Sequence, residues 1–264
     1  MKYAAIASGS NGNCYYIAQG EDIILVDAGI NCKHMELRML NLGINPAQVK
    51  ALFITHEHTD HIKGLSVFCK RYQIPVYLTA GTYAGSKLRL PEELVHLMAV
   101  DGEVQIGALT VQGIPKFHDA KEPCSFMVSN GQHQIAVLTD LGRACEHVIA
   151  AVSNCHVLFL EANYDAEMLA KGRYSYFLKN RISGGWGHIS NASALAIFTE
   201  HRSESLQHLI LSHLSGQNNT VEIVETLFAP HCNGIQLTVA TREKETELFD
   251  CKQLRVNNAL IFAS

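Results

Sequence analysis

The sequence FITHEHTDH at residues 53–61 constrains this chain more than any other stretch. It overlaps the end of an apolar run, residues 49–54, that is typical of a buried strand, and residues 62–65 indicate a loop turning into a helix. Imidazoles two residues apart at a strand end can converge on one metal ion, while the next carboxylate and imidazole point to a neighbouring site. Nitrogen ligands mixed with carboxylate oxygens suit zinc, manganese or iron better than calcium or magnesium. The stretch therefore predicts a metal site with these candidate ligands: His56, His58, Asp60 and His61.

The composition indicates a globular protein without an overall basic charge. Of the 264 residues, 47% are hydrophobic and 17% charged, which allows a sizeable core in one large domain or two small ones. The net charge is −4, so binding to nucleic acid would need a local basic patch. Eight scattered cysteines without a C-x-x-C pair favour reduced, mostly buried thiols in a cytosolic protein. The start of the chain has no signal-peptide core and no apolar run approaches about 18 residues, which predicts a cytoplasmic protein outside the membrane.

Short apolar runs and helical periodicity predict the elements of a mixed α/β chain without an internal linker or repeat. Strands are expected at residues 2–7, 14–18, 22–26, 49–54, 76–78, 104–106, 109–114, 125–128, 135–138, 157–160, 206–211 and 235–240. Helices are expected at residues 34–42, 64–72, 192–201 and 220–228, and the tail from residue 242 is expected to add a strand or two. Glu161, which follows one of these strands, is expected to be a solvated strand end.

Two polar segments could bind an anion. Residues 8–13, SGSNGN, form a tight loop whose backbone N–H groups can face a phosphate, although an ordinary hairpin turn explains them as well. Residues 187–191, GHISN, open a predicted helix, and a helix N-terminus with a histidine beside it is a ready anion site. The candidate phosphate-binding side chains are Ser8, Ser10, Asn13, Ser190 and Asn191.

Residues 170–188 differ in composition from the rest of the chain. Basic side chains alternate there with tyrosine, phenylalanine and tryptophan, the combination that backbone tracking and base stacking require. A solvated helix face would explain the charges, and core packing would explain the aromatic rings. We expect nucleic-acid contact from four residues: Lys171, Arg173, Lys179 and Arg181.

The motif H-x-H-x-D-H after a strand resembles the signature of the metallo-β-lactamase superfamily. The resemblance implies an αββα sandwich of two mixed sheets flanked by helices, with residues 1–264 as one domain. It also implies two divalent metal ions (zinc, manganese or iron) and an aspartate, Asp27, that supports the ligand loop from beneath without being a ligand. The implied ligands are His56, His58 and His118 for one ion, Asp60, His61 and His213 for the other, and Asp140 between them.

Three segments further resemble the YycJ/WalJ branch: residues 8–13, the TDLG sequence at 139–142, and residues 187–191. That branch is similar to ribonuclease Z and more distantly to the β-CASP nucleases, and its members are described as 5′-to-3′ DNA exonucleases. The interval between Asp140 and His213 is too short for an inserted β-CASP domain, which argues against a ribonuclease J-like enzyme.

The resemblance implies a phosphodiesterase that acts on nucleic acid, with DNA preferred over RNA. A hydroxide bridging the two ions would attack the phosphorus, Asp60 would take the proton of the nucleophile, and His188 would donate to a phosphate oxygen or to the leaving group. The alternatives are an RNA-processing nuclease, a small-molecule thioesterase or lactonase of glyoxalase II type, and a metal-stabilised binding subunit without activity. No obligate protein partner is evident in the sequence.

Overall fold

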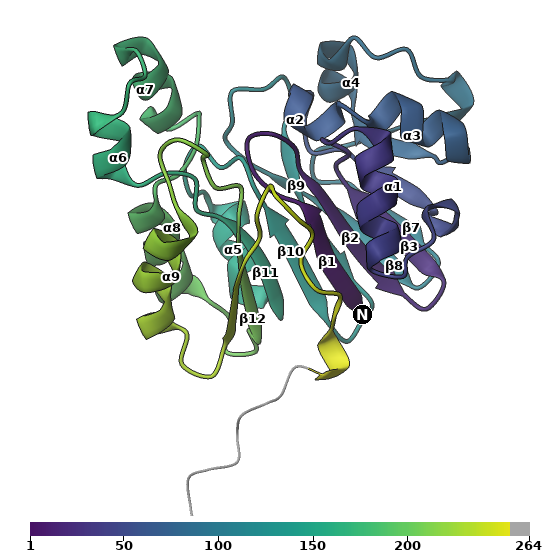
Figure 1. Cartoon of the computed structure of the whole chain (residues 1–264). Coiled ribbons are helices and arrows are strands. Elements are labelled where there is room, and N and C mark those ends of the chain that lie inside the picture. Colours follow the sequence, from purple (N-terminus) through teal and green to yellow (C-terminus); the bar gives the residue numbers. More distant parts are fainter. Residues whose placement is uncertain (254–264) are drawn as a thin grey trace, which may run out of the picture.

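A computed structural model describes residues 1–253 as two seven-stranded sheets packed face to face, with helices on both outer sides (Figure 1). In the first sheet, the order of strands is β14-β1-β2-β3-β4-β5-β6. Its strands are β1 (Lys2–Ala7), β2 (Cys14–Gln19), β3 (Asp22–Val26), β4 (Ala51–Phe53), β5 (Val76–Thr79), β6 (Val95–Met98) and β14 (Phe249–Asp250).

In the second sheet, the order of strands is β13-β12-β11-β10-β9-β8-β7. Its strands are β7 (Glu103–Ile106), β8 (Leu109–Pro115), β9 (Cys124–Ser129), β10 (Gln134–Leu138), β11 (Val157–Glu161), β12 (His208–Ser212) and β13 (Gln236–Val239). Both sheets are mixed, as predicted. β3 to β6 are parallel, and so are β10 to β13, while the remaining neighbours are antiparallel.

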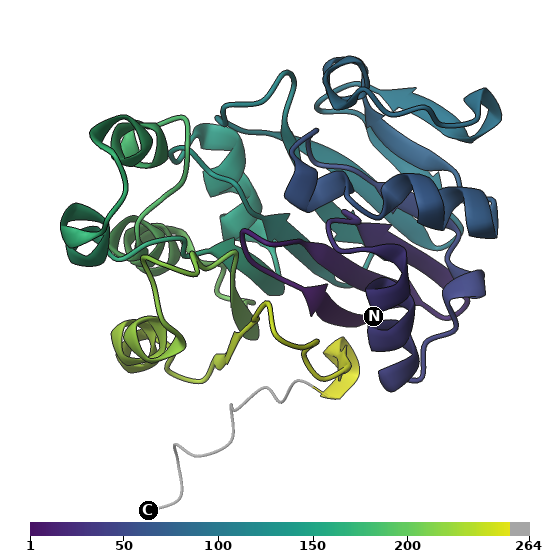
Figure 2. The same ribbon diagram turned by 45° about the horizontal axis from the view of Figure 1, so that its top comes forward.

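The helices cover the outer faces of the sandwich, as Figure 2 shows with the top edge turned forward. Those nearer the first sheet are α1 (Cys32–Asn41), α2 (Thr59–Ile62), α3 (Leu65–Tyr72) and α4 (Ala80–Ser86). Those nearer the second are α5 (Glu146–Asn154), α6 (Ala166–Lys171), α7 (Tyr176–Ser183), α8 (Asn191–His201) and α9 (Val221–Phe228). Single turns of 3₁₀ helix in the described residues are Pro46–Gln48, Glu92–Leu94, Ala229–His231 and Cys251–Gln253.

Alternation along the strands builds three apolar layers from one chain. In β11, Phe159 points into the core between the sheets, whereas Leu158 and Leu160 point outward under the helices. β12 repeats this pattern, with Ile210 inside and Leu209 outside. Because side chains on a strand alternate between faces, both faces of a central strand must be apolar when helices cover the outer one. That requirement explains why the central strands are unbroken apolar runs in the sequence.

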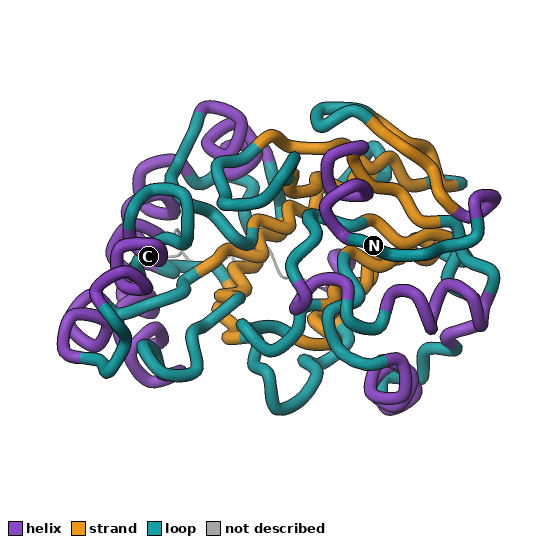
Figure 3. The backbone as a smooth tube through the Cα atoms, turned by 90° about the horizontal axis from the view of Figure 1, so that it is seen from above, coloured by secondary structure: helices purple, strands orange, loops and turns teal. Residues whose placement is uncertain are grey.

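One edge of the sandwich collects the ends of several parallel strands. The carboxyl ends of β3 and β4 lie there in the first sheet, and those of β10, β11 and β12 in the second. In the view onto this edge, loops cross between two flanks of helices (Figure 3). Residues that follow these strands are therefore brought together although they are far apart in the sequence.

Two further expectations concern the ends and the surroundings of the chain. The tail provides β14, and the rest of that prediction, from residue 254 onward, lies outside the described residues. Over residues 1–253, every helix is too short or too polar to cross a lipid bilayer.

Candidate metal centre

Three histidines form the first group of potential metal donors. His56 and His58 follow β4, and His118 follows β8 from the opposite sheet. Their donor atoms all lie within 4.8 Å of one another. His118 Nδ1 donates a hydrogen bond to the carbonyl of Gly187 at 2.9 Å, which leaves Nε2 to face the other two rings. Burial lowers the pKa of His56 and of His118, so both rings are neutral, which is the form that binds metal.

Two carboxylates and two histidines form the second group. Asp60 and His61 come from the first turn of α2, Asp140 follows β10, and His213 follows β12. Their donor atoms also lie within 4.8 Å of one another. Burial disfavours a charge on Asp140, but the neighbouring His213 and His61 outweigh it and hold the pKa of that carboxyl well below its usual range. Asp140 is therefore an anion.

Asp140 lies between the two groups. Its Oδ2 is 3.1 Å from His61 Nε2 and 3.0 Å from His213 Nδ1, on the side of the second group. Its Oδ1 is 3.8 Å from His118 Nε2, on the side of the first. The carboxylate thus presents one oxygen to each group, which is the geometry of a bridging ligand.

Several buried polar atoms of both groups form no hydrogen bond within residues 1–253: His56 Nε2, Asp140 Oδ2 and His213 Nδ1. Asp140 Oδ2 and His213 Nδ1 are close to each other but are not aligned as donor and acceptor. Buried polar atoms in native proteins are almost always paired, and an unpaired one calls for an ion, a water or another explanation. Here the unpaired atoms belong to imidazole and carboxylate groups that point at common centres. The donor set therefore fits divalent metal ions with mixed nitrogen and oxygen coordination.

Asp27 lies beneath the groups and is completely buried. Its Oδ2 accepts a hydrogen bond from His61 Nδ1 at 2.7 Å, which turns His61 Nε2 toward Asp140. Its Oδ1 accepts from the backbone N–H of Thr55 at 2.9 Å, and the hydroxyl of Thr55 lies 3.0 Å from His56 Nδ1. The Asp27 carboxylate thus orients His61 directly and His56 through Thr55. Carboxylates that hydrogen-bond to metal-binding histidines commonly have this role.

His188 and Glu161 form a pair next to Asp140. Glu161 Oε1 accepts a hydrogen bond from His188 Nδ1 at 2.6 Å, and Glu161 Oε2 accepts from the backbone N–H of Leu141 at 2.5 Å. Burial opposes protonation of His188, but Glu161 and then Asp140 outweigh it and raise its pKa to about 9. Cations bound nearby would counteract part of that effect.

The expectation that Glu161 is a solvated strand end is wrong, because the side chain is fully buried. The sequence shows only that Glu161 ends an apolar run, and the order of strands supplies the rest of the signal. Glu161 ends β11, which lies between β10 and β12, and these parallel strands carry Asp140 and His213 at the same ends. A carboxylate at the same end of the middle strand must therefore lie next to these two residues.

Both donor groups open into a cleft of about 400 Å³. Asp60, Asp140 and His213 line it on the side of the sandwich, and His188 lines one wall. The opposite contribution comes from the segment that contains α7: Tyr174, Leu178, Arg181 and Ile182. In Figure 1, α6 and α7 stand at the same upper edge as α2. The cleft therefore has a polar floor and a wall that is partly apolar and basic.

Comparison with known proteins identifies the family. The protein-family model described as a β-lactamase superfamily domain matches residues 23–214. The chain belongs to this superfamily. Exodeoxyribonuclease YycJ of Bacillus anthracis is 31% identical over 226 residues, covering 84% of this chain and 86% of that one. Exodeoxyribonuclease WalJ of Streptococcus pneumoniae is 30% identical over 228 residues, covering 84% and 85%.

Among solved structures, the metallo-β-lactamase fold protein YhfI of Bacillus subtilis matches with a TM-score of 0.72 at 18% identity, covering 93% of this chain and 99% of that one. The predicted superfamily, its YycJ/WalJ branch and the sandwich of two mixed sheets are confirmed. The protein is a metal-dependent hydrolase of the superfamily.

The five candidate phosphate-binding side chains occupy different environments. Ser10 is exposed and lines the cleft, and Ser190 lines an adjoining cavity of about 350 Å³ that shares His188 with it. Ser8, Asn13 and Asn191 are buried. Ser8 accepts a hydrogen bond from the backbone N–H of His213 at 2.8 Å.

Asn13 contacts the backbone of the metal-binding loop, and Asn191 pairs with another buried asparagine, Asn219. The backbone N–H of Asn13 donates to the carbonyl of Asp60 at 2.8 Å, and Gly29 packs so closely on the same carbonyl that a Cβ there would lie 1.6 Å from it. Asn191 exchanges side-chain hydrogen bonds with Asn219 at 3.0 and 2.8 Å. Asn13 and Gly29 therefore hold the metal-binding loop at Asp60.

The four basic residues predicted to contact nucleic acid are all at the surface on the α6–α7 side. Arg181 lines the cleft and forms an ion pair with Asp119 at 2.5 Å. Lys171 pairs with Glu167, one helical turn earlier, and the ammonium group of Lys179 donates to the carbonyl of Ala170 at 2.6 Å. Arg173 is exposed. Of the four, Arg181 is the one that the structure brings to the donor groups.

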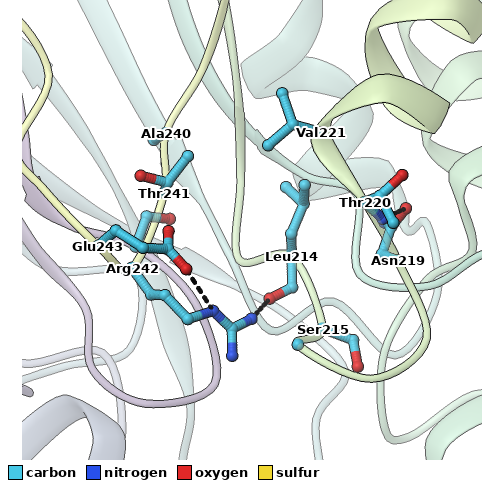
Figure 4. A pocket seen from close by; sticks show the side chains of 11 residues that line it. Leu214, Ser215, Asn219, Thr220, Val221, Ala240, Thr241, Arg242 and Glu243 are labelled. Atoms are coloured by element: carbon cyan, nitrogen blue, oxygen red, sulfur yellow. Dashed lines mark hydrogen bonds and ion pairs between the residues drawn. The ribbon is translucent and has the colours of Figure 1, made fainter.

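The turn after His213 is held from behind by Arg242. The guanidinium of Arg242 donates to the carbonyl of Leu214 at 2.7 Å, at the side of a cavity of about 250 Å³ (Figure 4). Gly216 lies against the same guanidinium, and a Cβ there would come within 2.0 Å of it. Arg38 in turn donates to the carbonyls of Arg242 and Glu243, both at 2.8 Å. The segment after β13 thus fastens the His213 turn.

Proposed function

We propose that this protein is a two-metal phosphodiesterase that removes nucleotides from the 5′ end of DNA. One observation carries the proposal: Asp140 faces two groups of metal donors at the floor of a cleft whose wall contains Arg181 and Tyr174. The exodeoxyribonuclease relatives, which match most of the chain, support nucleic acid as the substrate and DNA over RNA.

In this proposal, His56, His58 and His118 would hold one ion, Asp60, His61 and His213 would hold the other, and Asp140 would be available to both. Two divalent cations would supply Lewis-acid stabilisation of the phosphate and an activated water at neutral pH. The roles that remain belong to side chains of this protein.

Asp60 is suited to accept the proton of the attacking water. Burial opposes ionisation of its carboxyl, but His61 and His213 outweigh it and lower its pKa, so the carboxylate is an anion at neutral pH. It also lines the cleft, which gives it access to the reacting groups.

His188 is suited to donate a proton or a hydrogen bond. Its Nδ1 is committed to Glu161, which fixes the ring and leaves Nε2 for the substrate in the cleft that the ring lines. In this role, Glu161 acts through His188 and does not itself touch the substrate.

Recognition of the 5′ end would use the side of the cleft near His188. Ser10 lines the cleft, and Ser190 is the N-cap of α8, an 11-residue helix whose N-terminus carries partial positive charge. Charge-assisted contacts to a terminal phosphate are worth about 1.5–3 kcal/mol, which corresponds to a rate difference of roughly tenfold to a few hundredfold.

The test uses DNA and RNA strands of one sequence, each with a 5′-phosphate or a 5′-hydroxyl, and protein loaded with manganese or zinc. We expect 5′-phosphorylated DNA to be cleaved fastest, with mononucleotides as products. Ser10→Ala should reduce the preference for the phosphate, with little effect on the 5′-hydroxyl strand.

Equal rates on both kinds of 5′ end would remove the exonuclease assignment. Faster turnover of RNA would make the protein an RNA-processing nuclease. Turnover of thioesters without cleavage of any nucleic acid would favour the glyoxalase II-type alternative.

A further inference from the structure

The segment around α7 exposes aromatic side chains that a folded protein normally covers. None of the residues of α7 is buried, and two rings at its start are among the most exposed large hydrophobic side chains of residues 1–253: Tyr176 at 74% and Phe177 at 85%. Trp186, shortly after the helix, is 53% exposed. Elsewhere in the described chain, the exposed large hydrophobic residues are aliphatic, such as Leu37 and Leu40 on α1. The exposed aromatic surface is therefore concentrated at one place.

That place adjoins the catalytic cleft. Tyr174, two residues before the exposed pair, lines the cleft, and so does Leu178, the residue after it. Tyr176 and Phe177 contact each other edge to face, with ring centroids 6.2 Å apart. A ligand that leaves the cleft past Tyr174 would meet the first turn of α7, which carries both rings. The pair thus lies outside the cleft lining, on the helix that forms its wall.

The charge around the rings selects the kind of ligand. Residues 171–190 contain four basic side chains and no acidic one, in a chain whose net charge is −4. Lys171 and Arg181 pair with carboxylates outside the segment, whereas the other two, Arg173 and Lys179, form no ion pair among residues 1–253. The immediate neighbours of the two rings on α7 are polar, because Ser175, Lys179 and Asn180 share its surface. A contact with a second copy of the chain would require a broader apolar face. A polyanion that carries flat, apolar groups matches both the charge and the rings.

We propose that Tyr176 and Phe177 form a stacking platform for unpaired bases of the strand whose end lies in the cleft. The proposal rests on the nuclease function proposed above and extends it, because it makes single-stranded nucleic acid the preferred form of the substrate. Bases in a blunt duplex are stacked on one another and are not available to the rings. Any base can stack on an aromatic side chain, so the platform would increase affinity for the strand without sequence preference.

The experiment compares the double variant Tyr176→Ala/Phe177→Ala with a matched control, Leu37→Ala/Leu40→Ala, which removes two exposed hydrophobic side chains from α1. Each metal-loaded protein is assayed for kcat/KM on a single-stranded 12-mer, on the same strand in a blunt duplex, and on a dinucleotide. Binding of the fluorescently labelled 12-mer is measured in parallel. A second set of 12-mers carries one abasic site, moved along the strand.

We expect the double variant to lose about ten- to a hundredfold in kcat/KM on the single strand, the effect of about one stacked base. Its activity on the dinucleotide should stay within twofold of wild type, because that substrate ends inside the cleft. The wild-type protein should lose a similar factor when the abasic site reaches the rings. The double variant should be indifferent to that abasic site, and the α1 control should behave as wild type in every assay.

Two results would overturn the platform while leaving the nuclease function intact. One is wild-type kcat/KM of the double variant on the single strand. The other is an equal response of both proteins to every abasic site. A change from dimer to monomer in light scattering of the double variant would assign the rings to a second copy instead. If the wild type cleaves no nucleic acid, the proposed function fails, and the binding measurement still decides the platform: unchanged affinity in the double variant, or no binding by the wild type, overturns it.

Discussion

The floor and the wall of the cleft are built in opposite ways. On the floor, the donor side chains are mostly buried and are held by partners behind them, as Asp27 holds His61 and the Gly187 carbonyl holds His118. On the wall, α7 has no buried residue and its aromatic rings face solvent. The floor is thus set by the folding of the sandwich. The wall contributes Arg181, which pairs with Asp119, and aromatic rings that the fold leaves exposed.

This difference separates the effects expected from mutation. Changes on the floor should alter metal content and kcat, because the donors must be held in one arrangement to act. Changes on the wall should alter KM and the dependence on substrate length. A substitution on the floor that changed KM alone would contradict this assignment of kcat to the floor and KM to the wall.

The largest effect is expected from Asp60→Asn. The amide cannot take the proton of the nucleophile, so kcat should fall by about 10²- to 10⁴-fold, the usual contribution of a general base. The melting temperature should change little, because the side chain lies at the cleft surface and is 24% exposed. Steady-state kinetics and thermal unfolding measure the two quantities. Glu57→Gln is the matched control, since Glu57 belongs to the same loop but to neither donor group; a similar loss in both variants would remove the role assigned to Asp60.

A smaller effect on a different quantity is expected from Asp27→Ala. The variant removes the acceptor of the His61 and Thr55 hydrogen bonds, so affinity for metal should fall by about 10- to 100-fold. Titration against a chelator of known affinity measures this change, and metal analysis of wild type should give about two ions per chain at saturation. Saturating metal should restore most of the turnover of Asp27→Ala and none of that of Asp60→Asn. Unchanged metal affinity in Asp27→Ala would mean that the metal donors do not depend on the hydrogen bonds from Asp27.

The smallest effect on activity is expected at His208, which lies in neither region. It is buried at the start of β12, where it hydrogen-bonds to Tyr3 and Thr238, and burial lowers its pKa to about 3. An unfolded histidine has a pKa of about 6.5. Below that pH the unfolded chain therefore binds a proton at His208, whereas the native ring stays neutral. Stability should therefore be retained above pH 6.5 and fall as the pH drops toward 3, by roughly 2 kcal/mol between pH 6.5 and 5.

Urea unfolding of metal-free protein across this range tests the contribution of His208. Metal-free samples are needed because acid also releases metal from histidine ligands. His208→Gln should flatten the decline while leaving turnover of the metal-loaded enzyme at neutral pH unchanged. Parallel curves for wild type and variant would show that this histidine has no share in acid sensitivity.

The strands were the most predictable part of the fold, and the reason is physical. A central strand between two apolar layers must be apolar throughout, and β3, β11 and β12 are legible in the sequence for that reason. The helix α7 was not assigned. Its residues are all partly or fully exposed, so packing imposes no periodic pattern on them. That the whole chain forms one domain stays a prediction.

The candidate site divides in a similar way. The H-x-H-x-D-H stretch is a local pattern, and the distant donors His118, Asp140 and His213 were predicted through the family resemblance; the structure brings them to it, while their role as ligands stays a prediction. Glu161 was interpreted as a solvated strand end because one carboxylate after a strand has no local pattern, and only the order of strands puts it beside His188. Ser8 looked like a phosphate contact because small polar residues suit both an anion loop and a buried hydrogen-bond network, and burial cannot be read from them.

Three residues of the floor have a left-handed backbone conformation, which residues other than glycine rarely adopt. Asp27, Asp140 and His213 have φ angles of 62°, 55° and 56°. Left-handed conformations of this kind cost about 1–3 kcal/mol each and tend to occur at active sites. Glycine at any of the three would relax the backbone and at the same time remove a carboxylate or an imidazole. At these three positions, a substitution that raises stability removes a group that the enzyme needs. A screen for thermal stability alone would therefore select inactive variants.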